Sequence, residues 1–455
     1  MGELIAAIAT GATRSAIGTV RLSGPGAAGA AAAVFRPANG RSLLDHPART
    51  LVYGTLTDGA DRAVDKCMAV WFKARNSYTG EDSAELQCHG SPMVLSMALE
   101  LLFAQGARQA GPGEFTRRAF LNGRLDLTQA EAVMDLIDGE TPQAVYCAAG
   151  QLSGALSRRV GAVYDGLLDV AAHFHAVLDY PDEDIDPFTA KTLSDGLDAA
   201  RTGLAALLAT YGRGKYLTRG VPCAIVGAPN AGKSSLLNAL LGYDRAIVTD
   251  VPGTTRDTVE ERCALGGTLL RLIDTAGLRD TEDPVEKLGV ARSREALERA
   301  ELALVLVDGH AGMTEEDAAL LARAAGGCPA ILVWTKADLP AAPAPLLNLS
   351  PPPLTVAVSA VTGQGLDRLS AAVAELFPQA EAGDGELLTN ARQAEAARRA
   401  LDAVERAAAA LGGGFTPDAV LVDVEDALGV LGELTGQTVR EDVTDRIFSR
   451  FCVGK

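Results

Sequence analysis

A glycine-rich segment in the middle of the chain has the composition and spacing of a phosphate-binding loop. Residues 227–234 read GAPNAGKS and fit the pattern G-x-x-x-x-G-K-[ST]. A short apolar run precedes the segment and a helical pattern follows it, which is the context this motif requires. Backbone N–H groups of such a loop can bind phosphate oxygens, Lys233 supplies a positive charge, and Ser234 offers a hydroxyl ligand to Mg²⁺. These residues predict a nucleoside triphosphate site.

Three further short motifs decide which base this site would take. Asp274-Thr-Ala-Gly277, Thr335-Lys-Ala-Asp338 and Ser359-Ala each follow an apolar run that predicts a strand. With the phosphate loop, they come in order at the carboxyl ends of strands, where open α/β sheets bind ligands. The carboxylate of Asp338 can accept two N–H bonds from the edge of guanine, which adenine cannot donate. The set therefore predicts GTP rather than ATP.

Residues 249–257 and the position after the D-T-A-G motif bear on hydrolysis. A loop carrying Thr255 can close over Mg²⁺ when the γ-phosphate is present. Leu278 stands where Ras-like enzymes place the glutamine that orients water. Asn230 offers a neutral oxygen near the β- and γ-phosphates, so an oxygen cage there could hold a monovalent cation. We expect K⁺ rather than Na⁺, because a loop of carbonyls forms a wide cage.

These motifs require a sheet whose strands all end at one edge. Over residues 217–377 short apolar runs alternate with helical patterns, which predicts a mainly parallel sheet covered on both faces. The expected strands are Cys223–Val226, Leu269–Ile273, Ala303–Val307, Ala330–Trp334 and Leu354–Val358.

The rest of the chain has two other textures. In the first ~120 residues, β-like runs such as Ile17–Leu22 and Cys67–Phe72 alternate with helical pattern such as Pro92–Phe103, which predicts a mixed α/β domain. Helical pattern then runs to about Tyr216 and returns after residues 378–386. We interpret it as one helical domain that is split by an inserted block.

The helical segments carry their own boundary signals. Thr128 and Glu131 have the spacing of a capping box, which predicts a helix start at Thr128. A long apolar stripe runs from Leu152 to Phe174 and should end at Asp179-Tyr180-Pro181, because proline breaks helices.

The predicted domains are 1–120, 121–216, 217–377 and 378–455, of which the second and fourth form the split helical domain.

Composition narrows the function classes. The 455 residues are 48% hydrophobic with a net charge of −17, so the chain can build several cores but should not hold polynucleotides by bulk charge alone. The seven cysteines are scattered without a C-x-x-C pair, which argues against a disulfide framework or a zinc module. Neither a secretory signal nor a membrane-spanning run is evident, so a cytoplasmic protein without membrane contact is expected.

Several segments together resemble the MnmE (TrmE) family of tRNA-modification GTPases, over essentially the whole chain. They are GTVRLSGP (18–25), NSYTGEDSAELQCHG (76–90), PGEFTRRAFLNGRLDLTQAEAVMDLID (112–138), LDYPDEDI (178–185), GAPNAGKSSLLNAL (227–240), IVTDVPGTTRD (247–257), DTAGLR (274–279) and FCVGK (451–455). One departure is Thr335, where most relatives of this GTPase branch have asparagine. Guanine binding should survive, while the asparagine bond to the phosphate loop would be lost or replaced.

The resemblance implies an N-terminal α/β folate-binding domain that makes a homodimer, a discontinuous helical domain and an inserted Ras-like P-loop GTPase domain. The G domains of the family approach each other when GTP and K⁺ bind. By motif position, Glu286 would orient the attacking water. The K⁺ ligands would be Asn230, Thr249, Val251 and Thr254, and the Mg²⁺ ligands Ser234 and Thr255. The whole GTP-contacting set would be Asn230, Ala231, Gly232, Lys233, Ser234, Ser235, Thr249, Asp250, Val251, Pro252, Gly253, Thr254, Thr255, Asp274, Thr275, Ala276, Gly277, Thr335, Lys336, Ala337, Asp338, Ser359, Ala360 and Val361.

The resemblance also implies a one-carbon donor, 5-formyl- or methylene-tetrahydrofolate. Its pocket would include Arg21, Glu85, Arg124 and Lys455, where basic groups can meet the glutamate tail and a carboxylate can pair with the pterin N–H edge. Cys452 has two readings: a reactive thiol of the modification chemistry, or a small buried residue that packs the last helix.

In the family, a partner, MnmG, brings FAD and NADH in a heterotetramer-type complex. Together they add a carboxymethylaminomethyl or aminomethyl group at C5 of the wobble uridine of certain tRNAs. The resemblance therefore implies a K⁺-stimulated GTP hydrolase that acts in this modification. The alternative, supported by the GTPase motifs alone, is a GTP-switched ribosome or RNA assembly factor without modification chemistry.

Overall fold

The computed structural model describes residues 2–11, 13–179, 190–243, 261–273, 295–342, 352–378, 385–438, 444, 447–449 and 451–454. The chain divides into two compact units, each treated by itself below. The first unit is Met1–Met134 with Glu425–Lys455, and the second is Asp135–Val424.

A mixed sheet forms the centre of the first unit. Its strands among the described residues stand in the order β3-β4-β5-β6-β2-β1-β7, and neighbours are antiparallel except β1 and β7. Their bounds are β1 Ile5–Ile8, β2 Ser15–Ser23, β3 Phe35–Pro37, β4 Val52–Thr57, β5 Ala63–Phe72, β6 Ser83–Gly90 and β7 Arg108–Gln109. The predicted mixed α/β fold is confirmed, since β2 and β5 contain the two expected strands.

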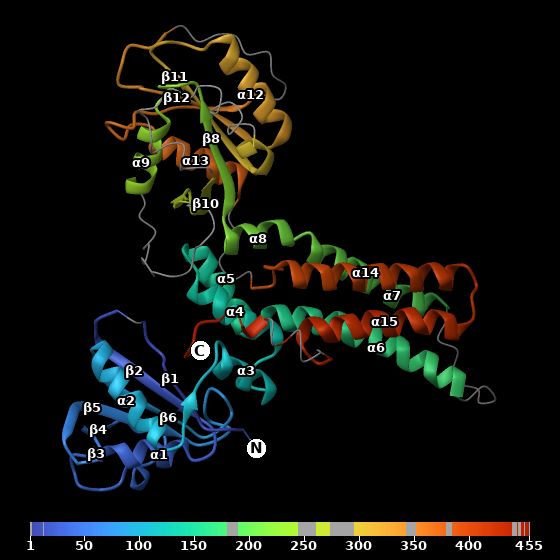
Figure 1. The fold of residues 1–455 in the computed structure, drawn as a ribbon. Helices are drawn as coiled ribbons and strands as arrows, with labels where there is room; N and C mark the ends of the chain where they lie inside the picture. The colour runs from blue at the N-terminus through green and yellow to red at the C-terminus, as the bar shows by residue number, and fades with distance from the viewer. Residues whose placement is uncertain are drawn as a thin grey trace. The chain divides into compact units, whose positions relative to one another are not determined.

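Helices cover one face of this sheet (Figure 1). The helix α1, Ala27–Val34, and the expected helix α2, Pro92–Ala104, both pack on β6. Alternate residues of the strands, such as Val20 and Leu22, are fully buried against them, as the two-residue period of a strand requires. A short helix, α3, Glu114–Leu121, follows β7, and a 3-10 turn spans Leu43–Asp45.

The last described residues of the chain belong to this unit. Val453 forms an antiparallel bridge with Pro112, and the N–H of Gly113 donates to the carbonyl of Cys452 over 3.2 Å. Gly454 has φ +100°, and a Cβ there would lie 2.2 Å from the Ile8 carbonyl oxygen. Only glycine fits such a close approach of two backbones, so the C-terminal tail is built to lie on this unit.

Helices and a second sheet make up the second unit. The described helices that lie wholly in it are α5 Pro142–Leu152, α6 Ala155–Asp179, α7 Ala190–Leu208, α8 Tyr211–Arg219, α9 Lys233–Tyr243, α12 Glu315–Gly327, α13 Leu366–Leu376 and α14 Ala391–Gly412. Two more, α4 Leu127–Ile137 and α15 Pro417–Thr435, run across the boundary between the units. Among the helices of the described ranges, none combines the length and apolar character that a bilayer span needs.

Two boundary predictions in the helical segments are wrong. The start of α4 is capped by Asp126, whose Oδ1 accepts from the N–H of Gln129, while Gln129 Oε1 accepts from the N–H of Asp126. The capping box therefore lies two residues before the Thr128–Glu131 pair, since an aspartate caps as well as a threonine. The stripe from Leu152 is also interrupted, because α5 ends at Leu152 and α6 begins at Ala155. The structure describes α6 as far as Asp179, and Tyr180 and Pro181 lie outside the described residues, so the predicted stop there stays a prediction.

The second sheet is mainly parallel, as predicted. Among the described residues its order is β13-β12-β11-β8-β10-β9, and each neighbouring pair is parallel except β10 and β9. The bounds are β8 Val221–Gly227, β9 Glu261–Leu265, β10 Thr268–Ile273, β11 Leu302–Asp308, β12 Ala330–Thr335 and β13 Leu354–Ala357. All five predicted strands are confirmed. Successive residues of a strand, such as Leu304 and Val305, belong to two different hydrophobic clusters. Each face of the sheet therefore packs against its own buried cluster.

Candidate functional site

The phosphate loop joins β8 to α9, as its sequence predicts. The loop turns through Asn230 at φ +61° and Gly232 at φ +90°, both in the left-handed region. The ammonium group of Lys233 donates to the carbonyl oxygens of Gly227, at 2.8 Å, and Ala228, at 2.7 Å. Burial lowers the pKa of Lys233. The loop is thus already closed around its lysine, with the positive charge held at the place where phosphates would bind.

A threonine ties the base motif to this loop. Thr335, at the end of β12, is buried, and its hydroxyl donates to the carbonyl of Ala231 over 2.7 Å. The same hydroxyl also lies 3.2 Å from the carbonyl of Val307. Threonine has a shorter side chain than asparagine, but its hydroxyl still bonds to the backbone of the phosphate loop. The bond that an asparagine would make is therefore replaced.

The base motif is also held by the end of β13. The N–H of Ala337 donates to the carbonyl of Val358 over 3.2 Å. A hydrogen bond from Ser359, which is fully buried, lowers the pKa of the exposed Asp338 carboxyl. Asp338 is thus ionised and open to solvent, the state in which a carboxylate accepts two N–H bonds from a base. Val361 is 86% exposed, beyond the edge of this motif.

Part of the predicted nucleotide site lies outside the described residues. This part comprises Thr249, Asp250, Val251, Pro252, Gly253, Thr254, Thr255, Asp274, Thr275, Ala276, Gly277 and Glu286. What the structure brings to one edge of the sheet is the phosphate loop at the end of β8 and the base motifs at the ends of β12 and β13 (Figure 1). Parallel strands place their carboxyl ends together, so residues about a hundred positions apart meet there.

One strand end in this site was not singled out from the sequence. Asp308 ends β11, and its Oδ2 lies 2.6 Å from Nζ of Lys336. The signal was available in the sequence, because an aspartate after a buried apolar run stands at the ligand-binding edge of a parallel sheet.

The antiparallel strand β9 was missed as well. The Gly266-Gly267 pair, with φ +62° and +74°, turns the chain from β9 into β10. A glycine pair between two apolar runs is a hairpin signal.

The first unit contains three of the residues that the family resemblance assigns to folate. Arg21 and Glu85 stand opposite each other on β2 and β6, and Nε of Arg21 donates to Oε1 of Glu85 over 2.9 Å. The guanidinium carbon of Arg21 lies 5.6 Å from the ring centre of Tyr78 and 5.8 Å from that of Phe115. A charge between two aromatic rings is held in place by cation–π attraction and by its carboxylate partner.

The third residue borders the same loop. The stem of Arg124 packs on Gly80, because a Cβ there would lie 3.2 Å from Cγ of Arg124. Gly80 lies two residues after Tyr78, whose ring lies near Arg21, so both arginines lie close to the loop 76–82. Arg124 is exposed, and Lys455 lies outside the described residues. The described residues near this loop thus include two cations, one carboxylate and two aromatic rings.

Cys452 is exposed, whereas the other cysteines are buried or half-buried. Its carbonyl accepts from the N–H of Gly113, the N-cap residue of α3, the helix that carries Phe115. The tail thus places this thiol on the unit that contains Arg21 and Glu85. The exposure fits the reading of an available thiol better than that of a buried packing residue.

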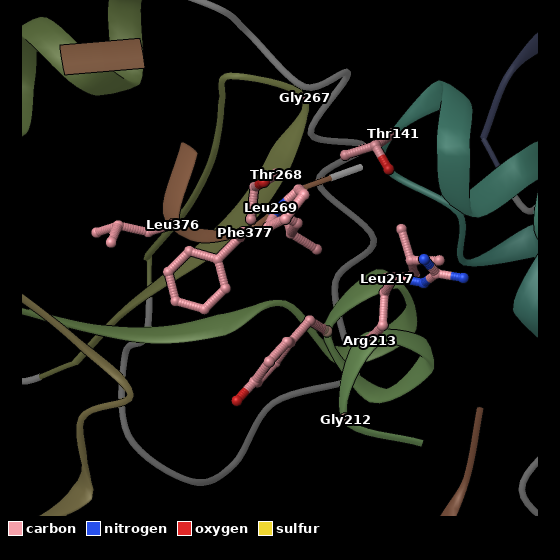
Figure 2. Close-up of a pocket in the computed structure, with 11 residues that line it drawn as sticks. Thr141, Gly212, Arg213, Leu217, Gly267, Thr268, Leu269, Leu376 and Phe377 are labelled. Atoms are coloured by element: carbon pink, nitrogen blue, oxygen red, sulfur yellow. The ribbon is translucent and has the colours of Figure 1, made fainter. Parts of the chain in front are cut away.

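A cavity of about 270 Å³ lies elsewhere in the second unit, at the opposite edge of the sheet from the phosphate loop. Figure 2 shows Leu376 and Phe377 on one side of it, with Leu217 of α8 across from them. The rings of Tyr216 and Phe377 meet edge to face at 5.4 Å. The cavity marks the place where the chain enters and leaves the sheet-containing part of this unit, so we assign it to packing and not to the nucleotide site.

The fold and the phosphate loop define a P-loop nucleotide-binding protein. A family model for the MnmE helical domain matches residues 127–452, and one for the GTP-binding protein TrmE N-terminus matches residues 4–124. The chain belongs to the MnmE family of tRNA modification GTPases.

Two curated relatives illustrate the likeness. A tRNA modification GTPase MnmE from Symbiobacterium thermophilum is 46% identical over 100% of this chain and 99% of its own. Another from Heliobacterium modesticaldum is 43% identical over 100% of both chains. Among solved structures, the G domain of the T. maritima FeoB iron transporter is 25% identical over 34% of this chain and 98% of its own, with a TM-score of 0.24.

Proposed function

We propose that this protein hydrolyses GTP to GDP and phosphate in the service of tRNA modification. The observation that carries the proposal is the junction of phosphate loop and base motif, where Thr335 bonds to Ala231 and Lys233 is held inside the loop. A site that fixes the phosphate-binding and base-binding residues to each other can read both ends of one nucleotide. The ionised Asp338 gives that site its preference for guanine.

The residues that are described fit a hydrated Mg²⁺ beside the phosphates. Ser234 stands at the start of α9, directly after Lys233, and its hydroxyl is the hard oxygen donor that this ion prefers. Thr255 would complete the protein's share of the ligands. When bound, the ion would draw charge from the β- and γ-phosphate oxygens, while Lys233 and the loop's N–H groups orient them.

Asn230 is the one described donor among the proposed K⁺ ligands. Asn230 is exposed in a left-handed turn of the phosphate loop, so its amide oxygen is available at the loop surface. Thr249, Val251 and Thr254 would supply the other oxygens. When bound, the ion would add positive charge where an arginine finger acts in other GTPases. Leu278 cannot orient water, and the family resemblance assigns that role to Glu286.

The first unit would hold 5-formyl- or methylene-tetrahydrofolate. Arg21 is already oriented by Glu85 and two rings, and Arg124 lies exposed beside Gly80 of the loop 76–82. A pterin that bonds to Glu85 would have to share it with Arg21, whereas Arg124 and Lys455 suit the glutamate tail. Cys452 would take part in the modification chemistry.

The wider arrangement follows from family membership. We propose domains 1–120, 121–216, 217–377 and 378–455, a homodimer through the first domain, and a cytoplasmic complex with MnmG that supplies FAD and NADH. The complex would add a carboxymethylaminomethyl or aminomethyl group at C5 of the wobble uridine. The TrmE-type N-terminus and the curated relatives support this function over a ribosome assembly factor without modification chemistry.

Mass analysis of tRNA nucleosides tests the function directly. Cells lacking the protein should lose the modified wobble uridine, and the wild-type chain should restore it while Lys233→Ala should not. Cys67→Ala, a buried change in the first unit far along the chain from the phosphate loop, serves as the expression control. Unchanged wobble uridine in the deletion strain would favour the assembly-factor function.

A further inference from the structure

The loop that carries the base motif is bonded to the phosphate loop and to the segment after β13, and the turn after β11 adds further hydrogen bonds to it. The N–H of Gly309 donates to the carbonyl of Thr335 over 2.9 Å, and the N–H of Ala342 donates to the carbonyl of Gly309 over 2.8 Å. The ring Nδ1 of His310 lies 2.9 Å from the carbonyl of Pro340. These contacts fix the backbone of residues 335–342 against the turn that follows Asp308.

Asp308 lies next to these contacts, and its two carboxylate oxygens bind different partners. Oδ1 accepts from the N–H groups of His310, at 2.9 Å, and Ala311, at 3.2 Å. Oδ2 accepts from Nζ of Lys336 at 2.6 Å. The hydrogen bond from Lys336 lowers the pKa of the Asp308 carboxyl, so this carboxyl is ionised at neutral pH.

Lys336 has a left-handed backbone, with φ +57°, which is strained for a residue that carries a Cβ. The side chain is 39% exposed, so its stem lies at the surface of the base motif, two residues before Asp338. The stem of a lysine can cover a flat ring while its ammonium group is bonded elsewhere. With the ammonium held by Asp308, the stem has one fixed direction.

We propose that Asp308 is a positioning residue for the nucleobase, which acts through Lys336 without touching the nucleotide. By fixing the ammonium group, Asp308 orders the lysine stem as a wall of the base site before guanine enters, and so lowers the entropy lost on binding. This inference rests on the proposed function, since it assumes that a guanine nucleotide occupies the site.

The test is Asp308→Asn, which keeps an oxygen for the two N–H groups of the turn and removes the charge that holds Lys336. We expect the Kd for GDP and the KM for GTP to rise about tenfold, as for the loss of one charge-assisted bond, with kcat within about twofold of wild type. A role confined to folding would lower the amount of active protein and leave KM unchanged. Glu301→Gln is the matched control, because it breaks a Lys215–Glu301 pair of the same 2.6 Å length at the far end of β11.

A double-mutant cycle shows whether Lys336 carries the effect. In a Lys336→Met background, which keeps an apolar stem without the ammonium group, Asp308→Asn should change the Kd for GDP by less than about twofold. An equal loss in both backgrounds, or an unchanged Kd in the single variant, would overturn the inference.

A separate arm reports on the proposed function. Wild-type protein should bind GDP, and Asp338→Asn should shift its preference from guanine toward xanthine, because the donor and acceptor sense at the base edge is reversed. If neither result is obtained, the assignment of the guanine site is wrong. If both are obtained and Asp308→Asn leaves the Kd for GDP unchanged, only the role proposed for Asp308 is wrong.

Discussion

The hydroxyl of Thr335 lies 2.7 Å from the carbonyl oxygen of Ala231, 104 positions earlier in the chain. This bond joins the end of β12 to the loop that follows β8, and β11 lies between these two strands in the sheet. The hydrogen bond therefore links the phosphate loop directly to the base motif. Gly232, beside Ala231, would place a Cβ 3.6 Å from Thr335, in ordinary contact.

Thr335→Val should weaken nucleotide binding. Valine keeps the shape of threonine but leaves the buried carbonyl of Ala231 without this donor, which costs about 1–3 kcal/mol. The Kd for GDP, measured by calorimetry, should therefore rise roughly 5- to 100-fold. Thr335→Ser keeps the hydroxyl and should stay close to wild type. Equal affinities for the valine and serine variants would show that the bond does not couple the two motifs.

GTP hydrolysis should be faster in KCl than in NaCl at matched ionic strength. Asn230→Ala should abolish this difference and leave GDP binding largely intact, because Lys233 and Asp338 remain. The control is Asn238→Ala, an exposed change on the outer part of α9. Equal steady-state rates in the two salts for the wild-type protein would exclude the cation mechanism and the assignment of Asn230. Glu286→Ala should slow hydrolysis in both salts.

Formyl-tetrahydrofolate should bind to the intact protein, and Glu85→Gln should weaken that binding about tenfold. The change removes the charge that orients Arg21 between Tyr78 and Phe115. Arg124→Ala should weaken it as well, through loss of a cation for the glutamate tail. Asp58→Asn, which breaks the exposed pair with Arg62, should have no effect on calorimetric affinity. Absence of heat with the wild-type protein would contradict the folate site.

The stability of the first unit should fall in acid through Glu114. Burial alone would raise the pKa of Glu114, but hydrogen bonds from Arg108, Gly111 and Arg118 lower it to about 2. Since an unfolded glutamate titrates near pH 4.3, this carboxylate contributes stability above that pH and loses it as the pH falls toward 2. Glu114→Gln should therefore reduce the free energy of unfolding by on the order of 2 kcal/mol at pH 7 and by little near pH 2.

Fluorescence of Trp71 in β5 can follow this unit alone. In a Trp334→Phe background the remaining tryptophan lies in the first unit, so urea unfolding reports on it. Glu100→Gln, at an exposed position of α2, is the control and should not change the pH dependence. A pH-independent difference between wild type and Glu114→Gln would mean that the arginine contacts do not depend on the charge.

Local patterns in the sequence were sufficient to predict most of the strands and helices and the motifs at the ends of the strands. Short apolar runs such as Cys223–Val226 and Ala330–Trp334 predicted strands, because such runs are typical of strands that are buried on both faces of a parallel sheet. The spacing of glycine and lysine predicted the phosphate loop. The start of α4 was misplaced because both Asp126 and Thr128 can cap a helix. The sequence does not show which of two such closely spaced residues is the cap. Strand β9 was missed because its five residues are only partly apolar.

Residue types and spacing alone predicted phosphate binding at Lys233 and guanine recognition at Asp338, whereas folate contacts at Arg21 and Glu85 were expected only from the family resemblance. The tertiary structure decided which of these groups meet, and what holds them. The bond from Thr335 to Ala231, the pair of Asp308 with Lys336 and the docking of the tail at Gly113 all join residues far apart in the chain. Such contacts depend on strand order and on the close approach of backbones, which local periodicity does not encode.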